Sequence, residues 1–306
     1  MRIFRNRGDI YIPKSGYKRS VESRILVVIL IAVIIFTAVF LVLVSRKYNS
    51  VTDFFAQGEV TTTQQSNAEQ VLPKISGKTN FLVFETDDEK TAIHSIFLIQ
   101  ADRDNLSYKV CVLSPDMKIG GKSLLDIFLL GDGGALQTQL TEYFGFEIDY
   151  YNQFEKGDFI TFIKELGTFI YPSSEKIKFD GGKGEDKYSI RFDEGEQNVD
   201  ANEFSNLLRY YSEDNEKLYI ANEIILYGLT QLFNAENYED AQSLFKLLIS
   251  SSTTNITVRN FENGRDGLYV FCEKNNEITV YSARAEYEKN ELTQNALKNI
   301  KGYFAK

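Results

Sequence analysis

Acidic residues and a single histidine gather around the turn between two apolar runs, where they could hold a divalent cation. Asp87, Asp88 and Glu89 directly follow the apolar run 80–86, and His94 begins the next run. Carboxylates suit hard cations, and imidazole is a common metal ligand. Asp87 and His94 therefore form a candidate metal pair, although an acidic turn is also typical of a solvated loop and such a histidine also makes local hydrogen bonds. As the only histidine, His94 excludes histidine clusters.

A long apolar segment precedes these residues. Residues 25–44 contain one polar side chain, Thr37, and are long enough for a helix that crosses the hydrocarbon core of a bilayer. Residues 1–24 carry seven basic residues against two acidic ones, and basic flanks stay in the cytoplasm. The sequence predicts an uncleaved signal anchor in the cell membrane, with a cytoplasmic N-terminus and an extracellular C-terminal domain. A cleaved signal peptide is the alternative, but residues 44–47 lack the usual cleavage pattern.

The part of the chain after the basic tail is strongly acidic. The whole chain carries a net charge of −9 although its first 24 residues are positive. Such a domain is not held on nucleic acid by electrostatics, so we expect no nucleic acid partner. Cys111 and Cys272 each lie inside an apolar alternating run. This setting favours two buried thiols, and a disulfide between them is the alternative.

The chain divides into four regions: a basic cytoplasmic tail (1–24), a transmembrane signal anchor (25–44), a juxtamembrane stalk (45–79) and an extracytoplasmic domain (80–306). Within the domain, apolar runs bounded by polar clusters predict buried strands, and apolar residues at helical spacing predict amphipathic helices. Strands are expected at 80–86, 95–102, 108–114 and 146–154, and helices at 133–144, 157–166, 203–211, 219–233 and 240–250. Residues 178–188 form a turn-rich surface excursion. This order predicts an α/β fold, an α-β-α sandwich with a mostly parallel central sheet.

The order of these segments and their residue patterns resemble those of a known protein family. The runs NFLVFETD, SIFLIQAD and YKVCVLSPD are followed by the stretch 144–167, FGFEIDYYNQF and then GDFITFIKELG. Together they resemble the LytR-CpsA-Psr (LCP) family, whose matching blocks include N-I-L-L-L-G-T-D and L-G-I-x-I-D-Y-Y. The resemblance covers about residues 80–255. It implies transfer of an anionic glycopolymer from polyprenyl pyrophosphate to peptidoglycan, with a divalent metal and several arginines around the pyrophosphate.

The resemblance also assigns roles to particular residues. Cations are needed at such a site because negative charge accumulates on the pyrophosphate as its bond breaks. Asp116 keeps a family acid, Arg209 keeps the arginine of the Y-x-R motif, and Lys217 replaces a further arginine. These three are the candidate catalytic residues, although Asp116 follows a proline and also suits a turn. Asp87 matches a family aspartate, and His94 stands where the family has a metal-binding aspartate, so these two are the candidate metal ligands.

Several charged positions of the family are altered. Ala92, Pro115 and Ile220 stand where the family has arginines, and Glu85 replaces a glycine. The implied Mg²⁺ or Mn²⁺ site is therefore weak or absent. The favoured hypothesis is a pseudoenzyme, that is, a non-catalytic relative of the LCP enzymes. It would act as a binding protein or as a scaffold in the assembly of cell-wall glycopolymers. Its expected partners are the membrane, a polyprenyl-linked lipid, a glycopolymer or envelope proteins. The alternatives are an active transferase with a rearranged site, and an envelope sensor or structural subunit.

Overall fold

The computed structural model describes residues 72–182 and 186–305, which belong to one compact unit. The predicted tail, signal anchor and most of the stalk lie outside the described residues. Among the residues that are described, no helix combines the length and the hydropathy that crossing a bilayer requires.

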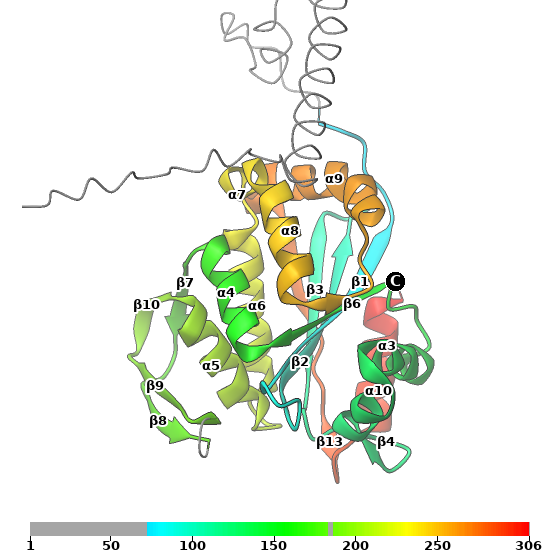
Figure 1. The fold of residues 1–306 in the computed structure, drawn as a ribbon, viewed down its shortest axis with the longest axis vertical. Helices are drawn as coiled ribbons and strands as arrows, with labels where there is room; N and C mark the ends of the chain where they lie inside the picture. The colour runs from blue at the N-terminus through cyan, green and yellow to red at the C-terminus, as the bar shows by residue number, and fades with distance from the viewer. Residues whose placement is uncertain (1–71, 183–185, 306) are drawn as a thin grey trace, which may run out of the picture. The chain divides into compact units, whose positions relative to one another are not determined.

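A six-stranded sheet in the order β11-β6-β1-β2-β3-β12 runs through the domain (Figure 1). Its central strands form where the sequence is apolar: β2 and β3 are buried along most of both faces, and β1 alternates buried with half-buried residues. Their bounds are β1 (Lys78–Thr86), β2 (Ile93–Asp102), β3 (Ser107–Leu113), β6 (Tyr150–Glu155), β11 (Thr253–Thr254) and β12 (Thr279–Ser282).

The sheet is mixed, so the prediction of a mostly parallel sheet is wrong, while the α/β class is confirmed. Only the β1–β6 and β3–β12 pairs are parallel; β1–β2, β2–β3 and β6–β11 are antiparallel. The physical reason lies in the links. Residues 87–92 and 103–106 join consecutive strands, and a parallel connection needs a crossover of about a dozen residues or more.

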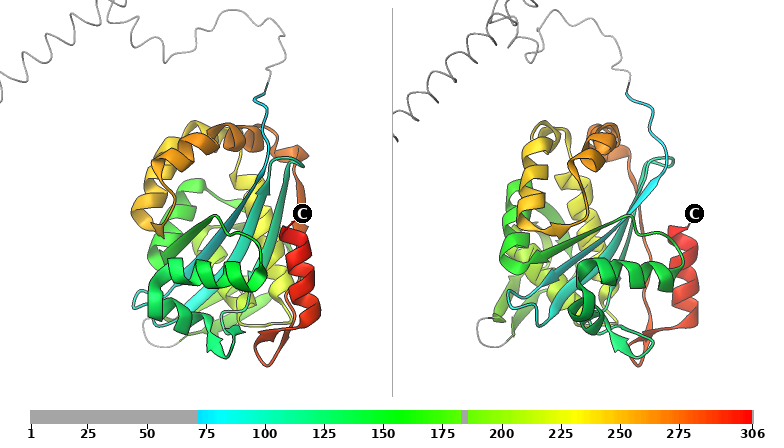
Figure 2. Two further views of the ribbon diagram at one scale, coloured as in Figure 1. Left: turned by 90° about the vertical axis from the view of Figure 1, so that its right-hand side faces the viewer. Right: turned by 45° about the vertical axis from the view of Figure 1, so that its right-hand side comes forward.

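Helices flank the sheet on both faces (Figure 2). One face is covered by α3 (Leu124–Phe144) and α10 (Gln294–Phe304). The other is covered by α4 (Lys156–Leu166), α5 (Ala201–Ser212) and α6 (Leu218–Leu232), with α8 (Ala241–Ser251) against α4. The helix α7 (Ala235–Glu239) precedes α8, and α9 (Val258–Glu273) and the 3-10 helix η2 (Asn275–Glu277) follow β11.

Four strand pairs lie outside the main sheet. They are β7 (Phe169–Ser173) with β10 (Gly195–Val199), β8 (Ile177–Gly181) with β9 (Tyr188–Phe192), β4 (Lys118–Ile119) with β5 (Lys122–Ser123), and β13 (Tyr287–Glu288) with β14 (Glu291–Leu292). The predicted surface excursion 178–188 contains the end of β8 and the start of β9. The β8–β9 hairpin packs beside α5, and Asp186, just before β9, pairs with Arg209 of α5.

The helix α3 is broken at Gly131 and Asp132, which do not have helical dihedral angles. Asp132 has φ of 74°, in the left-handed region, and its carboxylate accepts hydrogen bonds from the N–H groups of Gly134 and Ala135. It therefore caps the second half of the helix, the half that the sequence predicted. At the end of the first half, Leu129 and Leu130 are 59% and 76% exposed.

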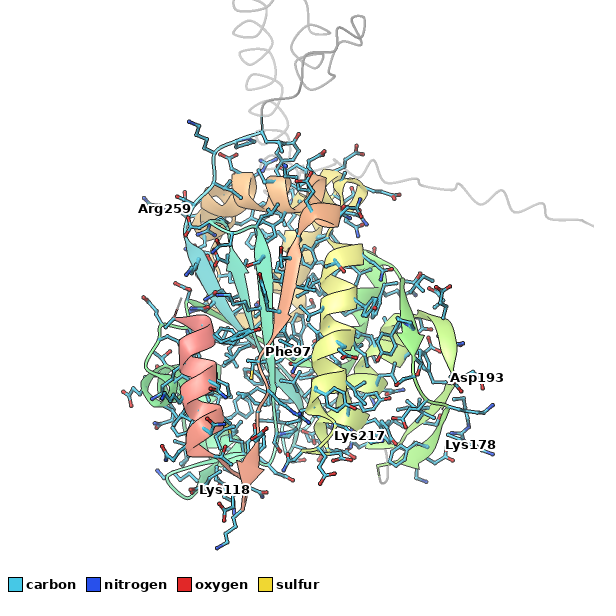
Figure 3. The ribbon with its side chains drawn as sticks, turned by 180° about the vertical axis from the view of Figure 1, so that it is seen from behind. Phe97, Lys118, Lys178, Asp193, Lys217 and Arg259 are labelled. Atoms are coloured by element: carbon cyan, nitrogen blue, oxygen red, sulfur yellow. The ribbon has the colours of Figure 1, made fainter. Side chains whose placement is uncertain are left out.

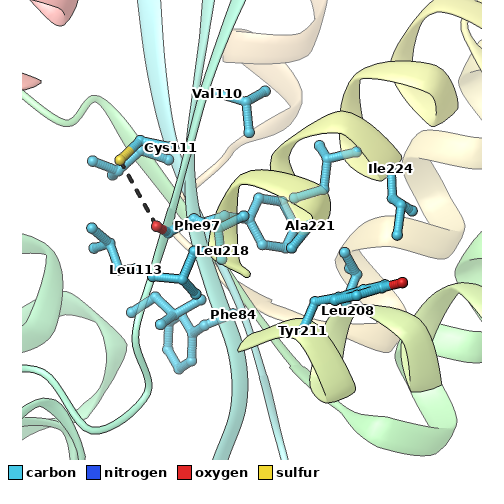
Figure 4. Packing of buried hydrophobic residues seen from close by; sticks show 14 of the residues in the cluster. Phe84, Phe97, Val110, Cys111, Leu113, Leu208, Tyr211, Leu218, Ala221 and Ile224 are labelled. Atoms are coloured by element: carbon cyan, nitrogen blue, oxygen red, sulfur yellow. Dashed lines mark hydrogen bonds between the residues drawn. The ribbon is translucent and has the colours of Figure 1, made fainter. Parts of the chain in front are cut away.

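The core behind the functional residues is filled by apolar side chains. Leu208 and Tyr211 of α5 lie among Ala221 and Ile224 of α6 and Phe97 of β2 (Figure 4). Each of these side chains is almost completely buried. Cys111 and Cys272 are also buried and are free thiols, as predicted; burial raises the pKa of each to about 12.

Candidate functional site

A buried carboxylate and a buried imidazole meet where β1 and β2 face α5. Glu85 is 1% exposed and His94 is 3% exposed. The Nδ1 atom of His94 lies 3.4 Å from Oε1 of Glu85. The strand register explains this pairing: Glu85 opposes Ser95 and Thr86 opposes Ile93, which leaves His94 as the extra residue of a β-bulge. A bulge re-aims a side chain, and here it turns the imidazole toward Glu85.

Ser205 of α5 completes this part of the cluster. Its hydroxyl lies 3.0 Å from both carboxylate oxygens of Glu85 and donates to them. The order is therefore serine, carboxylate, histidine. In a nucleophilic triad the histidine lies between the other two and takes the serine proton. The arrangement binds Ser205 to an acceptor but does not activate it as a nucleophile.

Arg209 lies one helical turn after Ser205, on the same face of α5. It is 8% exposed. Its Nη1 and Nη2 atoms donate to the two carboxylate oxygens of Asp186 at 2.8 and 2.7 Å, and its Nε donates to Glu213 at 3.2 Å. The guanidinium also lies over the ring of Tyr188, 4.4 Å from the centroid. The guanidinium is therefore engaged by two carboxylates and an aromatic ring within the protein.

Asp186 connects the arginine to the histidine. Its Oδ1 lies 3.2 Å from Nε2 of His94, but the contact lacks hydrogen-bond geometry, and this buried nitrogen has no hydrogen-bond partner among residues 72–182 and 186–305. Burial works against the ionised form of Asp186. The hydrogen bonds from Arg209 and the charges of His94, Arg209 and Lys156 outweigh this, so the pKa of Asp186 lies below its ordinary value. Asp186 is thus an anion held among cationic groups.

The lowered pKa of Asp186 predicts an acid dependence of stability. A carboxylate whose pKa is depressed by folding contributes stability above its unfolded pKa, and this contribution is lost as the pH falls through the folded value. With an ordinary value of 3.8, the loss should occur below about pH 4. Urea unfolding followed by circular dichroism should show that Asp186→Asn is less stable than the unmodified chain at pH 7 and that the gap narrows in acid. Asp180→Asn, which removes an exposed pair with Arg191, is the control; an equal narrowing there would contradict the prediction.

The structure brings two of the predicted site residues together, His94 and Arg209, through Asp186. The other three predicted residues, Asp87, Asp116 and Lys217, have different surroundings. Asp87 closes its own turn by accepting hydrogen bonds from the N–H groups of Thr91 and Ala92. Asp116 is an exposed turn residue. Lys217, at the start of α6 (Figure 3), donates to Glu175 at 3.2 Å, and this bond raises the pKa of the lysine.

The metal that the LCP resemblance implies does not fit these residues. In residues 72–182 and 186–305 no group of three or more histidine, cysteine or acidic side chains is arranged to hold a metal ion. Asp87 is committed to its turn, and the two ring nitrogens of His94 face Glu85 and Asp186. The carboxylate of Asp186 is in turn engaged by Arg209. The donors therefore form ion pairs with one another and leave no open set of oxygen ligands.

We accordingly expect weak binding of Mg²⁺ and Mn²⁺. Calorimetric titration of the full-length chain in detergent should give a dissociation constant of about a millimolar or weaker. The control is Asp87→Ala, which should not change the titration although it weakens the turn at residues 87–92. Micromolar binding that disappears in this variant would show that Asp87 is a metal ligand after all.

Two members of the cluster were missed by the sequence analysis. Ser205 carries no motif, and Asp186 lay in a stretch interpreted only as turn-rich. Glu85 was noted only as the replacement of a family glycine. Ser205 meets Glu85 because α5 packs against the sheet, and Asp186 meets Arg209 because the β8–β9 hairpin packs beside α5. No spacing along the chain signals either contact.

Comparison with known proteins gives a fold and no close relative. No family model and no curated protein sequence matches the chain. Among solved structures, a proposed transcription regulator from Eubacterium siraeum has a TM-score of 0.65 at 14% identity, over 81% of this chain and 99% of that one. TagV of B. subtilis has a TM-score of 0.57 at 16% identity, over 75% and 96%. TagT bound to LI-WTA has 0.53 at 13% identity, over 80% and 96%. TagV and TagT are LCP-family enzymes, so the resemblance to that family is confirmed at the level of the fold.

Proposed function

We propose that this chain is a membrane-anchored protein of the cell envelope that binds or scaffolds during the assembly of cell-wall glycopolymers and does not itself catalyse the transfer. The fold it shares with TagV and TagT supports the envelope role. The apolar segment 25–44 with its basic flank supports the anchoring. A wall glycopolymer is the proposed partner, since TagT is known bound to LI-WTA, a wall teichoic acid.

The proposal that the chain does not catalyse transfer rests on one observation: carboxylates of the protein already bind the guanidinium of Arg209. This is the arginine that matches the family motif, and Asp186 and Glu213 both bind it. Three carboxylates, those of Glu85, Asp186 and Glu213, surround one guanidinium and one imidazole. A transferase needs fixed positive charge that is free to stabilise the developing charge of the leaving group. Here the guanidinium is already engaged by the carboxylates of Asp186 and Glu213.

The rearranged-transferase alternative would need Asp87, Asp116, Lys217 and His94 to act with Arg209. Asp87 is held in its own turn and Lys217 in a pair with Glu175, and Asp116 is exposed in another turn. A scaffold or binding role does not require these residues to lie together in one site. It is therefore the better-supported function.

The proposal is tested by measuring binding and transfer separately. The full-length chain in detergent is mixed with a glycopolymer on polyprenyl pyrophosphate, peptidoglycan and Mg²⁺. Co-sedimentation with the glycopolymer measures binding, and label joined covalently to peptidoglycan measures transfer. Binding without transfer is the expected result. Transfer at the rate of an LCP-family enzyme would overturn the non-catalytic part, and the absence of binding would overturn the envelope role.

A further inference from the structure

The outer side of α6 carries a strip of exposed aromatic and apolar side chains. Tyr219 and Tyr227 of α6 are 41% and 39% exposed. Ile170 of β7 and Val280 of β12 are exposed beside them, at 45% and 41%. Figure 3 shows β12, α6 and β7 side by side on one side of the domain, and α6 packs against both strands. Large apolar side chains that gather on an exposed surface mark a site of interaction with another molecule.

Val280 belongs to this strip because of the pleat of β12. The ring of Tyr281 meets that of Tyr303 in α10, on the opposite face of the sheet. Successive side chains of a strand point to opposite faces, so Val280 points to the side of α6. Two charged side chains, described next, complete the surface. We call it the α6 face, and it consists of Ile170, Tyr219, Glu223, Tyr227, Val280 and Arg284.

Glu223 lies at the centre of the α6 face. It is one helical turn from Tyr219 and one from Tyr227, on the same side of α6. Among the residues that the structure describes, none forms an ion pair or a hydrogen bond with its carboxylate. Partial burial raises the pKa of this carboxyl above its ordinary value. A carboxylate in this setting is stabilised by a cation that another molecule brings.

Arg284, which follows β12, carries the complementary charge. Its side chain is exposed, and its guanidinium lies over the ring of Tyr219, 5.4 Å from the centroid. Within the described part of the chain, this guanidinium has no carboxylate at ion-pair distance. A guanidinium stacked on an aromatic ring still offers its N–H groups to a carboxylate. The α6 face therefore presents an acid and a base about one helical turn apart.

A surface with these two charges is complementary to a second copy of itself. In a dimer with two-fold symmetry every contact occurs twice, because a residue pair across the interface is repeated with the roles of the copies exchanged. Two α6 faces laid against each other bring Glu223 of each copy to Arg284 of the other, with Tyr219 and Tyr227 between them. Tyrosine and arginine are enriched in interfaces of this kind.

The direction of the elements allows such a dimer in one membrane. Lys78, Asp102, Ser107 and Thr279 form one row across the sheet, so β1 and β12 begin at the same end of the domain. In Figure 3 α6 runs along β12. A two-fold axis parallel to α6 therefore keeps the first strands of both copies at the same end. This arrangement suits two chains that are each anchored by residues 25–44.

We propose that this chain self-associates through the α6 face as a two-fold symmetric dimer, in which Glu223 of each copy pairs with Arg284 of the other. A second copy is the occupant because the α6 face supplies both charges of the ion pair. The dimer goes beyond the glycopolymer role proposed above, and it uses none of the residues around His94 and Arg209.

Sedimentation equilibrium of the full-length chain in detergent tests the dimer. The unmodified chain should show a monomer–dimer equilibrium. Glu223→Arg and Arg284→Glu should each weaken the association at least about tenfold, because like charges then meet twice across the interface. Glu142→Arg is the matched control, since it makes the same change in charge at an exposed position of α3, on the opposite face of the sheet. It should associate like the unmodified chain.

Mixing the two charge-reversed variants separates a contact between copies from an effect within one chain. One variant has two basic side chains at these positions and the other has two acidic ones, so an equal mixture should form heterodimers. Energy transfer between chains labelled at the N-terminus with a donor or an acceptor measures this. The double variant Glu223→Arg, Arg284→Glu should recover the association of the unmodified chain. Recovery on mixing also shows that both variants are folded.

Three results would overturn the inference. The unmodified chain could stay monomeric at every concentration, which would leave the α6 face to another partner. The dimer could persist in both charge-reversed variants, as it would if the predicted anchors held it together. The mixture could fail to associate although each variant has the circular dichroism of the unmodified chain. None of these results bears on glycopolymer binding, which co-sedimentation measures separately.

Discussion

Glycopolymer transfer by the full-length chain should be slower than transfer by an LCP-family enzyme with intact arginine motifs by about a thousandfold or more. One lost charge-assisted contact to a developing phosphate charge costs about 3 kcal/mol, or roughly a hundredfold in rate. Ala92 and Pro115 supply no such contact, and Arg209 is neutralised by Asp186. Losses of this kind are not additive, so the expected total is smaller than the product of single losses.

The control for this experiment is Arg209→Ala, which should leave the background rate unchanged while weakening the cluster. Transfer at the rate of an intact enzyme, lost in Arg209→Ala, would establish the rearranged-transferase alternative. Restoring every family charge together is not a clean rescue. Ile220 is 6% exposed, and Ile220→Arg would place an unpaired charge in the core. His94→Asp would add a carboxylate beside Glu85. Ala92→Arg and Pro115→Arg are the substitutions that the half-buried surface at these positions tolerates.

Leu208→Ala should lower the free energy of unfolding by about 2–5 kcal/mol, because it removes buried methyl groups and leaves a cavity between α5 and α6. Leu208 is 1% exposed and lies directly before Arg209. The loss is a large share of the stability of an ordinary domain. Urea unfolding of the full-length chain in detergent, followed by circular dichroism, measures it.

Leu130→Ala is the matched control, because the same substitution at a side chain that is 76% exposed should change stability by less than about 0.5 kcal/mol. Equal effects at the two positions would show that the contact between α5 and α6 is not packed as described.

The sequence predicted the elements better than their connections. The runs 80–86, 95–102 and 108–114 are strands because their apolar side chains are buried, on most of both faces in β2 and β3 and chiefly on one face in β1. Their direction was misjudged because alternation with helices was extended to three strands joined by short links. The first half of α3 was missed since LLDIFLL is apolar at nearly every position and shows no helical period. The β7–β10 pair was missed because its strands are short and half exposed.

Only two residues of the site, His94 and Arg209, could be predicted from the sequence. His94 was found because it is the only histidine, and Arg209 because it matches a family motif. Asp186 could not be found, since its role comes from the place where a hairpin meets a helix and from no property of its neighbours in sequence. Lys217 illustrates the opposite case. Its position in a family motif predicted that it belongs to the site, but in the structure it donates a hydrogen bond to Glu175.

The mixed sheet also has a consequence for how the chain folds as it is made. The strands β1, β2 and β3 are joined by short links and can form a meander as soon as they emerge. The strand that covers the outer edge of β3 is β12, which lies near the end of the chain. Until β12 is synthesised, β3 presents a row of unpaired backbone groups, the kind of edge that recruits other strands. We therefore expect the nascent protein to pass through an interval in which β3 is open on one side, when rapid completion of the chain or a chaperone would limit aggregation.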